Sequence, residues 1–556
     1  MTRSHGMGRS ATPGARGPSS GSDEEGTSLR HVMLQAGLDV LDRDGIGLGA
    51  SSVTYARVFR YLEDEYSIRV TRASVHERIW DSHEEFQRDV LAEAVRYLPA
   101  EVSQAEDTVL SSTVENLVAS ATPASARRSE FARLAGHSLF LATLHSPSSL
   151  EIQSMKALAA DPAGQSTSAV LQRLLSARAK RLRSLRSRRI SEVTHQLGLT
   201  VRPELGLTSG EAHDLFCIMA TNLFLGGALN YHAGCRDIVE PVNFMGTPTG
   251  VQQPWLVASI GLKAFLDLLF EADGVGERDR EQLDWRVGSA PRLEVRTELP
   301  APPRRSRLEL RQLVLSAAVE LLLRDGVGLR PTSGYATVFA YLRETQGLVL
   351  HRSSVHNRIW SSNDEFWTEV LAEGIERAPS PTAAAQSARD ALDERVASDD
   401  ASHAKQPVVD VIREFVSAQV DSLLNSQDYV RYQLIKATLP KLTPSPAVSK
   451  LQETTYAAYA HRLEQYSAAI DQYVLHGGLR VRPELQLDES AAVKIMSVLS
   501  FTSTTGAIFD RMAGIRTSER VFKLPRDREP DRYDDWLPPA IAAVAYFEQL
   551  FETNPT

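Results

Sequence analysis

Apolar residues recur at helical spacing early in the chain. One stripe has members at positions i, i+3, i+4, i+7 and i+11, a spacing that puts them on one face of a helix. The members are Tyr55, Val58, Phe59, Leu62 and Tyr66. Longer amphipathic segments follow at 168–198 and 489–514, whereas the alternation typical of strands is scarce. The pattern therefore predicts an all-α protein.

The chain contains this pattern twice. Val75 in RASVHERIWDSHEEF (72–86) corresponds to Val355 in RSSVHNRIWSSNDEF (352–366), an offset of 280 positions. Four more pairs of segments share an offset of 280 or 281: 29–48 with 310–329, 54–62 with 334–342, 201–207 with 481–487, and 255–271 with 536–552. This predicts a tandem duplication of a unit of about 250 residues, and not a short-period solenoid.

Composition and the repeat boundaries predict the domain organisation. The N-terminal residues are rich in Gly, Ser and Arg without an apolar centre, which favours a disordered tail over a secretory signal. The stretch ELPAPPRRSR is typical of an exposed linker. The predicted segments are a tail (1–28), a three-helix domain (29–99), a larger helical domain (100–272), a linker (273–308), a second three-helix domain (309–378), a flexible segment (379–404) and a second larger helical domain (405–556).

The repeated passage carries two helix starts. Thr71 is suited to cap a short helix over 72–80, because its hydroxyl can accept from the N–H groups of the first turn. Ser82 and Glu85 then have the spacing of a capping box, which opens the next helix. Ser362 and Glu365 repeat this box in the second copy. We therefore expect a helix-turn-helix in each copy.

One side of the helix 72–80 suits docking into a major groove. Val75 and Ile79 are expected to face the preceding helix, which leaves small, hydroxyl and basic side chains exposed. The candidate DNA-binding residues are Thr71, Arg72, Ala73, Ser74, His76, Glu77 and Arg78 in the first copy and Arg352, Ser353, Ser354, His356, Asn357 and Arg358 in the second. A solvated polar face is the alternative, and the nearby acids Glu63, Asp64 and Glu65 favour it.

The order of these features resembles the TetR/AcrR transcriptional regulators. The resemblance is carried by T-R-A-S-V-H-x-R-I from Thr71, by S-x-E-E-F from Ser82, and by VRPEL before a long helix, and it covers both copies. Two departures stand out. His83 and Asn363 replace the usual lysine after the serine, and Trp80 or Trp360 is an extra residue before it.

The resemblance implies a fold and a function. Each unit would be a three-helix helix-turn-helix domain followed by a helical effector and dimerisation domain, and the two units would form an intramolecular pseudo-dimer. The partners would be a double-stranded DNA operator and an unidentified small-molecule effector; further homodimerisation stays open. Because Asn pairs with adenine and Glu accepts from cytosine, Asn357 in place of Glu77 predicts unequal half-sites.

Net charge and cysteine content narrow the range of protein classes to which the chain can belong. The 556 residues carry a formal net charge of −9, which argues against a surface that is basic throughout, although only the docking face matters for DNA. Cys217 and Cys235 are too few for a disulfide framework or a four-cysteine zinc site. No apolar run looks long enough to span a bilayer. We expect a cytoplasmic protein with no membrane association.

The larger helical domains offer two further features. The run RAKRLRSLRSRR (178–189) is basic, and its counterpart in the second copy is not. A solvated face is the preferred interpretation, and an anionic effector, a second nucleic-acid contact or an acidic protein partner are the alternatives. In 216–234, Phe216, Met219, Asn222 and Tyr231 are weak candidates for an effector pocket, with plain core as the alternative.

No motif for catalysis is present. The histidines lack metal-ligand spacing, and no Ser or Cys lies in a recognisable nucleophile motif, so we expect neither an enzyme nor a cofactor or metal site. The sequence favours a DNA-binding regulator, most simply a repressor that an effector releases from its operator. The alternative is a ligand-sensing or protein-interaction module whose helix-turn-helix heads no longer bind DNA.

Overall fold

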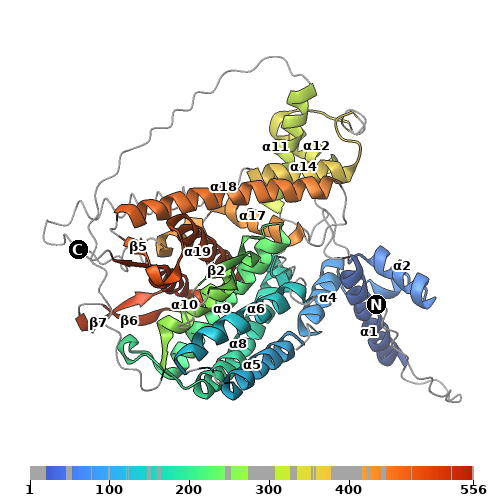
Figure 1. The fold of residues 1–556 in the computed structure, drawn as a ribbon. Helices are drawn as coiled ribbons and strands as arrows, with labels where there is room; N and C mark the ends of the chain where they lie inside the picture. The colour runs from blue at the N-terminus through green and yellow to red at the C-terminus, as the bar shows by residue number, and fades with distance from the viewer. Residues whose placement is uncertain are drawn as a thin grey trace. The chain divides into compact units, whose positions relative to one another are not determined.

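The computed structural model is mostly helical, which confirms the predicted all-α class (Figure 1). It describes residues 21–44, 53–76, 78–97, 101–120, 122, 124–146, 152–153, 155–157, 159–160, 165–244, 252–272, 307–325, 335–351, 355, 358–376, 416–420, 422–423, 426–439, 446–476, 479–526 and 529–553. The chain divides into two units: Met1–Arg43 with Val53–Glu93, and Asp44–Ser52 with Ala94–Thr556. The predicted flexible segment 379–404 lies outside the described residues.

The first unit contains the first three-helix region. Its helices are α1 (Gly21–Asp44), α2 (Tyr55–Tyr66), α3 (Arg72–Val75) and most of α4 (His83–Tyr97). Because α1 begins at Gly21, residues 21–28 are helical, and the predicted disordered tail is too long by this stretch. Thr54 begins α2 by accepting from the Arg57 amide at 3.3 Å, and Ser67 ends it in the left-handed conformation with φ of 56°.

The apolar stripe of α2 builds the core of this unit. Tyr55, Val58 and Leu62 are buried, and the Tyr55 ring stacks on Phe86 of α4 with centroids 4.9 Å apart. Tyr66, predicted as the last member of the stripe, is instead 56% exposed. The helix ends at this residue, and the Tyr66 ring meets the edge of the Tyr61 ring with centroids 5.9 Å apart.

The second unit holds the remaining helices. From the first copy it contains α5 (Glu101–Ala119), α6 (Ala124–His145), α8 (Gln165–Gln196), α9 (Ser209–His232) and α10 (Val257–Leu269). From the second copy it contains α11 (Arg307–Asp325), α12 (Tyr335–Gln346), α14 (Asn363–Glu376), α17 (Gln427–Thr438), α18 (Pro446–His476), α19 (Glu489–Met512) and α20 (Pro538–Leu550). The second three-helix region, with α11, α12 and α14, thus belongs to the larger unit, and α14 packs against α18 (Figure 1). The linker prediction ran to residue 308, but α11 already begins at Arg307.

Short strands occur where the sequence analysis expected almost none. The first copy has β1 (Leu199–Val201) paired with β4 (Phe270–Ala272) and β2 (Pro241–Phe244) paired with β3 (Gln253–Leu256). The second copy repeats this with β5 (Leu479–Val481) on β8 (Phe551–Thr553) and β6 (Phe522–Arg526) on β7 (Glu529–Trp536). All four pairs are antiparallel. The pair β1–β4 joins the segment before α9 to the end of α10, and β5–β8 does the same around α19 and α20.

The last three residues of each VRPEL segment form a single 3-10 turn, η2 (Pro203–Leu205) and η6 (Pro483–Leu485). Two further turns, η3 (Asp237–Val239) and η7 (Arg516–Glu519), come after the long helices α9 and α19. The expected order of VRPEL before a long helix is therefore present in both copies. Thr208 then opens α9 with a capping box, in which the Glu211 carboxylate accepts from the Thr208 amide at 3.0 Å.

The helices α9 and α19 cross at very short range. A Cβ atom on Gly226 would lie 1.9 Å from the carbonyl oxygen of Thr502, and one on Gly506 would lie 2.0 Å from that of Asn222. Only glycine, which lacks a side chain, permits such an approach of two backbones. Gly506 and Thr502 lie 280 positions after Gly226 and Asn222. The glycine of each copy therefore contacts the same position of the other copy, so the two contacts are reciprocal.

These two helices also combine length with an apolar composition. Both α9 and α19 are long and apolar enough to cross a bilayer, which the sequence analysis did not anticipate. Of their most apolar stretches, 78% and 94% of residues are buried inside the protein. Such burial is typical of core helices, and it is compatible with a soluble protein.

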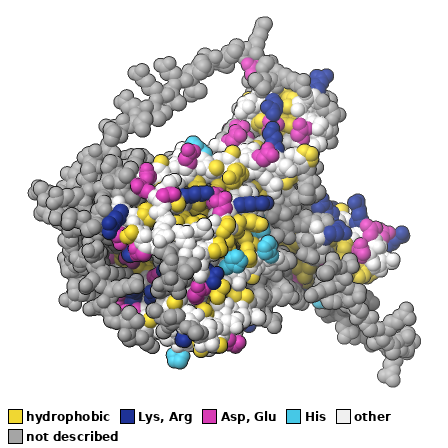
Figure 2. Space-filling view, viewed as in Figure 1, with side chains coloured by type: hydrophobic (Ala, Val, Ile, Leu, Met, Phe, Trp, Pro, Cys, Tyr) yellow, Lys and Arg dark blue, Asp and Glu magenta, His cyan; other side chains and the backbone are white. Residues whose placement is uncertain are grey.

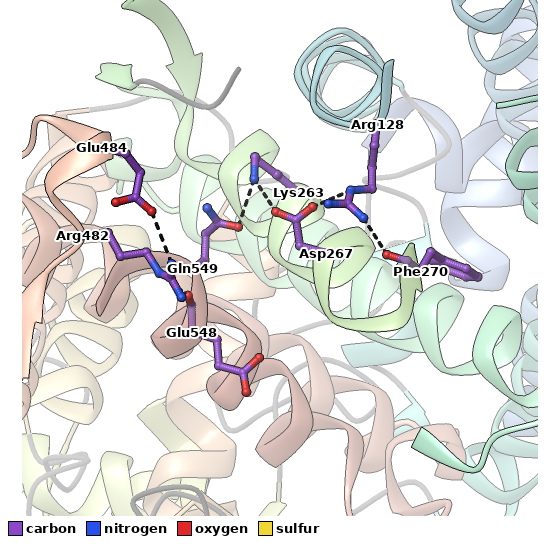
Figure 3. A network of polar contacts seen from close by, with 8 residues as sticks. All are labelled: Arg128, Lys263, Asp267, Phe270, Arg482, Glu484, Glu548 and Gln549. Atoms are coloured by element: carbon purple, nitrogen blue, oxygen red, sulfur yellow. Dashed lines mark hydrogen bonds and ion pairs between the residues drawn. The ribbon is translucent and has the colours of Figure 1, made fainter. Parts of the chain in front are cut away.

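A network of polar contacts links α10 with α6 and α20 (Figure 3). Arg128 of α6 lies 2.7 Å from Asp267, and Lys263 contacts both Asp267 and Gln549 of α20, the latter at 3.3 Å. Burial alone would raise the pKa of Asp267, but Lys263 and Arg128 outweigh it and hold that pKa below its ordinary value. The charged side chains between these helices are therefore paired with one another, which offsets the cost of removing them from water.

Candidate functional site

The first candidate site is the helix-turn-helix of the smaller unit. The predicted helix 72–80 is shorter in the structure, because α3 covers only Arg72–Val75 and a turn at Arg78 and Ile79 follows. Trp80 explains the early end. Its indole N–H donates to Asp89 at 2.9 Å, its ring meets the edge of Phe86 at 4.8 Å, and the side chain is 1% exposed.

The extra tryptophan is part of an anchor that both copies share. In the first copy, Asp89 accepts from Trp80 and also from Arg30 of α1 at 2.6 Å. In the second copy, Glu369 accepts in the same way from Trp360 and from Arg311 of α11. The anchor connects the first helix of each region, α1 or α11, with the turn at Trp80 or Trp360 and with the helix after that turn, α4 or α14. Sequence analysis noted the tryptophan as a departure and did not see its partners.

The predicted capping boxes are present in a shifted form. Ser82 Oγ accepts from the Glu85 amide at 3.1 Å, and Ser362 Oγ accepts from the Glu365 amide at 3.0 Å. In a standard box, the carboxylate would accept from the amide of the capping serine itself. Here Glu85 accepts from the amide of Asp81 at 2.9 Å, and Glu365 accepts from the amide of Ser361 at 2.7 Å, each one residue before the serine. Hydrogen bonds from Ser361 hold the pKa of Glu365 below its ordinary value.

The candidate DNA-contacting residues differ in exposure. Thr71, Arg72, Ala73 and Arg78 are exposed, whereas Ser74 and His76 are half-buried. Ser74 is committed to the helix start, since its hydroxyl accepts from the Thr71 amide at 3.2 Å and donates to the Thr71 carbonyl at 2.7 Å. In the second copy Arg358 is exposed. The remaining candidates, Glu77, Arg352, Ser353, Ser354, His356 and Asn357, lie outside the described residues.

The surface around the first head has mixed charge. Glu63, Asp64 and Glu65 are exposed on the last turns of α2, and Arg69 pairs with Glu63 at 2.8 Å. Figure 2 shows dark-blue and magenta side chains side by side over the region of α2. The negative charge of a DNA backbone favours contact with the arginines and not with the acids of α2. Arg72 and Arg78 are exposed arginines on and just after α3.

The second candidate site is a cavity of about 560 Å³ in the larger unit. Its walls come from α5, α6, α8 and α9, with Leu262 of α10 and the end of α19 completing them. Phe216 lines this cavity, as the sequence analysis proposed. The volume lies within the range of pockets that bind small molecules.

The other three predicted pocket residues are not among its lining residues. Met219 is fully buried in the apolar core, and Asn222 accepts from Ser518 at 3.1 Å beside the α9–α19 crossing. Tyr231 lies under the Arg236 guanidinium, 5.8 Å from the ring centre. These side chains share helix α9 with Phe216 but point to other neighbours, because one helix faces several partners in turn.

The basic run on α8 forms one side of this cavity. Five of its arginines line it: Arg178, Arg183, Arg186, Arg188 and Arg189. Arg178, Arg183, Arg186 and Arg189 are half-buried, while Lys180, Arg181 and Arg188 are exposed. The preferred interpretation of this run as a solvated face therefore holds for only part of it. Its apolar edge and its arginines both contribute to the cavity wall.

Acidic residues of the same wall pair with some of these cations. Glu106 of α5 receives two hydrogen bonds from Arg186, at 2.5 and 2.9 Å, and its carboxylate raises the pKa of that arginine. Arg189 lies 2.6 Å from Glu192 and 3.9 Å from Asp107. Burial lowers the pKa of Arg178, and the charges of Arg186 and Arg181 lower it further.

Two residues of the wall come from distant parts of the sequence. Lys156 lies among the helical residues 155–157, and Asp510 lies near the end of α19 in the second copy. The sequence analysis singled out neither of them, nor Glu106. No local pattern identifies such residues, because their roles depend on contacts between segments that are 354 positions apart.

The cysteines give no sign of reactivity. Cys217 lines the cavity and Cys235 lies in the core; both are buried as free thiols. Burial raises the pKa of each thiol to about 12, so both stay protonated and weakly nucleophilic at neutral pH. Among the described residues, no group of three or more His, Cys, Asp or Glu side chains is placed to hold a metal ion.

Comparison with known proteins adds no relative. No protein-family model, no curated protein and no solved structure matches the chain significantly.

Proposed function

We propose that this protein is a cytoplasmic DNA-binding transcriptional regulator of the TetR type, with two tandem units that form an intramolecular pseudo-dimer. The observation that carries the proposal is the anchor that both copies share, Trp80–Asp89–Arg30 and Trp360–Glu369–Arg311, next to the helix-turn-helix pattern repeated in the sequence. In the first copy, the exposed Arg72 begins the short helix α3, and the exposed Arg78 lies in the turn that follows it. Arginines at such a position reach phosphates and base edges in a major groove.

The crossing of α9 and α19 supports the pseudo-dimer. In a two-fold interface, residue i of one subunit contacts residue j of the other, and j contacts i. Gly226 against Thr502 and Gly506 against Asn222 have this reciprocal form within one chain. Fusing two subunits makes the second head's binding intramolecular, which raises its effective concentration at the operator.

The mechanism follows from coupling between the heads and the cavity. Two heads must meet successive major grooves roughly 34–36 Å apart. An effector that binds more tightly to a state with another head spacing would shift the population toward that state and release the operator. Repression with release by the effector is the simplest such scheme.

The proposal is tested with a selection from a pool of random duplex DNA, followed by affinity measurements at increasing salt. We expect a selected site whose affinity falls steeply with salt concentration, because phosphate contacts release counterions. Replacing Arg72→Ala together with Arg352→Ala should abolish this binding. Arg173→Ala, at an exposed arginine of α8, is the matched control and should leave it unchanged.

Two outcomes would contradict the proposal. One is a chain that selects no duplex, and the other is an affinity that the double variant and the control reduce equally. Either outcome would favour the alternative, a ligand-sensing or protein-interaction module whose heads have lost DNA affinity. The acids on α2 and the replacement of the usual lysine by His83 are the features that favour this alternative.

A further inference from the structure

The cavity in the larger unit has an excess of positive charge. Among the described residues, its lining contains six cationic side chains, Lys156 and five arginines of α8, and four acidic ones. The acidic residues are Glu106, Asp107, Glu192 and Asp510. With all of these groups ionised, the wall carries two more positive charges than negative ones.

The acidic residues are already engaged with other cations. Asp510 pairs with Lys156 at 2.5 Å, Glu106 with Arg186 at 2.5 Å, and Glu192 with Arg189 at 2.6 Å. Asp107 is nearest to Arg189, at 3.9 Å. Among the described residues, Arg183 makes no hydrogen bond or ion pair, although it is half-buried and lines the cavity. Arg183 and the exposed Arg188 are therefore the lining arginines for which the described residues provide no acidic partner.

The rest of the wall is apolar. Large hydrophobic side chains of α6, α9 and α10 face the same space, among them Phe131, Leu139, Phe216, Phe224 and Leu262. Removing apolar surface from water stabilises a bound hydrocarbon by roughly 25 cal/mol per Å². A cavity with an apolar body and a cationic side matches a molecule that has an apolar chain and one anionic end.

We propose that this cavity binds a single-chain amphiphile with a carboxylate head, with the head at Arg183 and the chain among the apolar side chains of α6 and α9. Arginine suits this role because its planar guanidinium donates two parallel hydrogen bonds to a carboxylate. A cationic amphiphile would be repelled by the positive excess. A neutral one would leave the half-buried Arg183 without an anionic partner.

The inference names the effector class of the proposed regulator and rests on that proposal for its biological meaning. The binding itself depends on the cavity alone and is measured without DNA. A chain that binds DNA but no amphiphile would refute only this inference. A chain that binds the carboxylate but no DNA would refute only the proposed regulator.

The experiment compares three ligands with the same chain and different heads: dodecanoate, 1-dodecanol and dodecyltrimethylammonium. Calorimetric titration of the full-length protein, below the concentrations at which these ligands form micelles, gives their dissociation constants. We expect dodecanoate to bind at least roughly tenfold more tightly than 1-dodecanol, as a charge-assisted hydrogen bond implies, and the cation to bind most weakly. Equal affinity for all three, a preference for the cation, or no binding of any ligand would overturn the proposal.

Variants of α8 identify the head-binding residue. Arg183→Met should weaken dodecanoate binding about tenfold and leave 1-dodecanol binding unchanged, which also shows that the variant is folded. Arg183→Lys keeps the charge and should retain most of the preference for the anion. Arg173→Met, at an exposed arginine of the same helix outside the cavity, is the matched control. Dodecanoate affinity that is the same in Arg183→Met and Arg173→Met would refute the assignment.

Discussion

Lys156 Nζ lies 2.5 Å from Asp510 Oδ1, and both side chains are almost completely buried. The two residues are 354 positions apart and come from different copies of the repeat. The ion pair therefore connects the cavity wall of the first copy to α19, the central helix of the second.

Removing one partner of this pair should be costly. Lys156→Met leaves the Asp510 carboxylate buried without its cation, which typically destabilises a fold by roughly 3–5 kcal/mol. The double variant Lys156→Met with Asp510→Leu removes both charges, so it should recover most of the loss. Urea midpoints followed by circular dichroism measure this order. A single variant as stable as the double variant would show that the pair is not coupled.

Gly226→Ala should destabilise the crossing of α9 and α19. The new Cβ would lie 1.9 Å from the carbonyl oxygen of Thr502, and backbone on both sides cannot yield as a side chain can. Overpacking of this kind costs typically about 1–3 kcal/mol, occasionally more. Thermal unfolding of the variant should show a clearly lower midpoint than the wild-type protein.

Gly210→Ala is the control on the same helix. No atom lies within 4 Å of the position where its Cβ would be, and alanine is favoured over glycine in a helix by roughly 0.5–1 kcal/mol. This variant should be as stable as the wild-type protein or slightly more so. If both variants had the same midpoint, the close approach of the two backbones would be refuted.

Lys436 should make the stability of the larger unit depend on pH. The side chain is fully buried, donates to Asn230 Oδ1 and lies 5.1 Å from the centre of the Tyr432 ring. Burial lowers the pKa of Lys436 from its ordinary 10.5 to about 8. Between these two values only the unfolded chain holds the proton, so raising the pH through this window favours the folded state.

The measurement compares wild-type protein with Lys436→Met at pH 7 and pH 9.5. The difference in unfolding free energy between the two proteins should shift in favour of the wild type by about 2 kcal/mol over this interval. Using the difference cancels the titration of other groups. A difference that stays constant with pH would mean that Lys436 keeps its ordinary pKa.

Glu77→Asn should make the two heads prefer the same half-site. The residue corresponds to Asn357, and both belong to the stretch predicted to face the groove. The wild-type chain should select a palindrome with unequal halves, because Glu accepts from cytosine and Asn pairs with adenine. Selection from random duplex DNA with each protein tests this. Identical halves selected by the wild-type chain would contradict the assignment.

Sequence alone predicted the helical class, the duplication and the helix starts at Ser82 and Ser362. Helical periodicity and capping residues act over a few positions, so Thr54, Ser82 and Ser362 fix their helix starts through local hydrogen bonds. The stripe led by Tyr55 likewise defines the buried face of α2. The predicted length of the helix 72–80 was wrong, because α3 ends at Val75. Trp80, which was expected on that helix, instead donates to Asp89 of α4.

The cavity, the close crossing of α9 and α19, and the position of the basic run 178–189 in the cavity wall were apparent only from the tertiary structure. Phe216 lines the cavity while Met219, three positions later, does not, because Met219 packs into the apolar core. Lys156 and Asp510 became a pair only when folding removed both from water and placed them in contact. Such pairing depends on three-dimensional proximity and burial, which no local pattern of residues encodes.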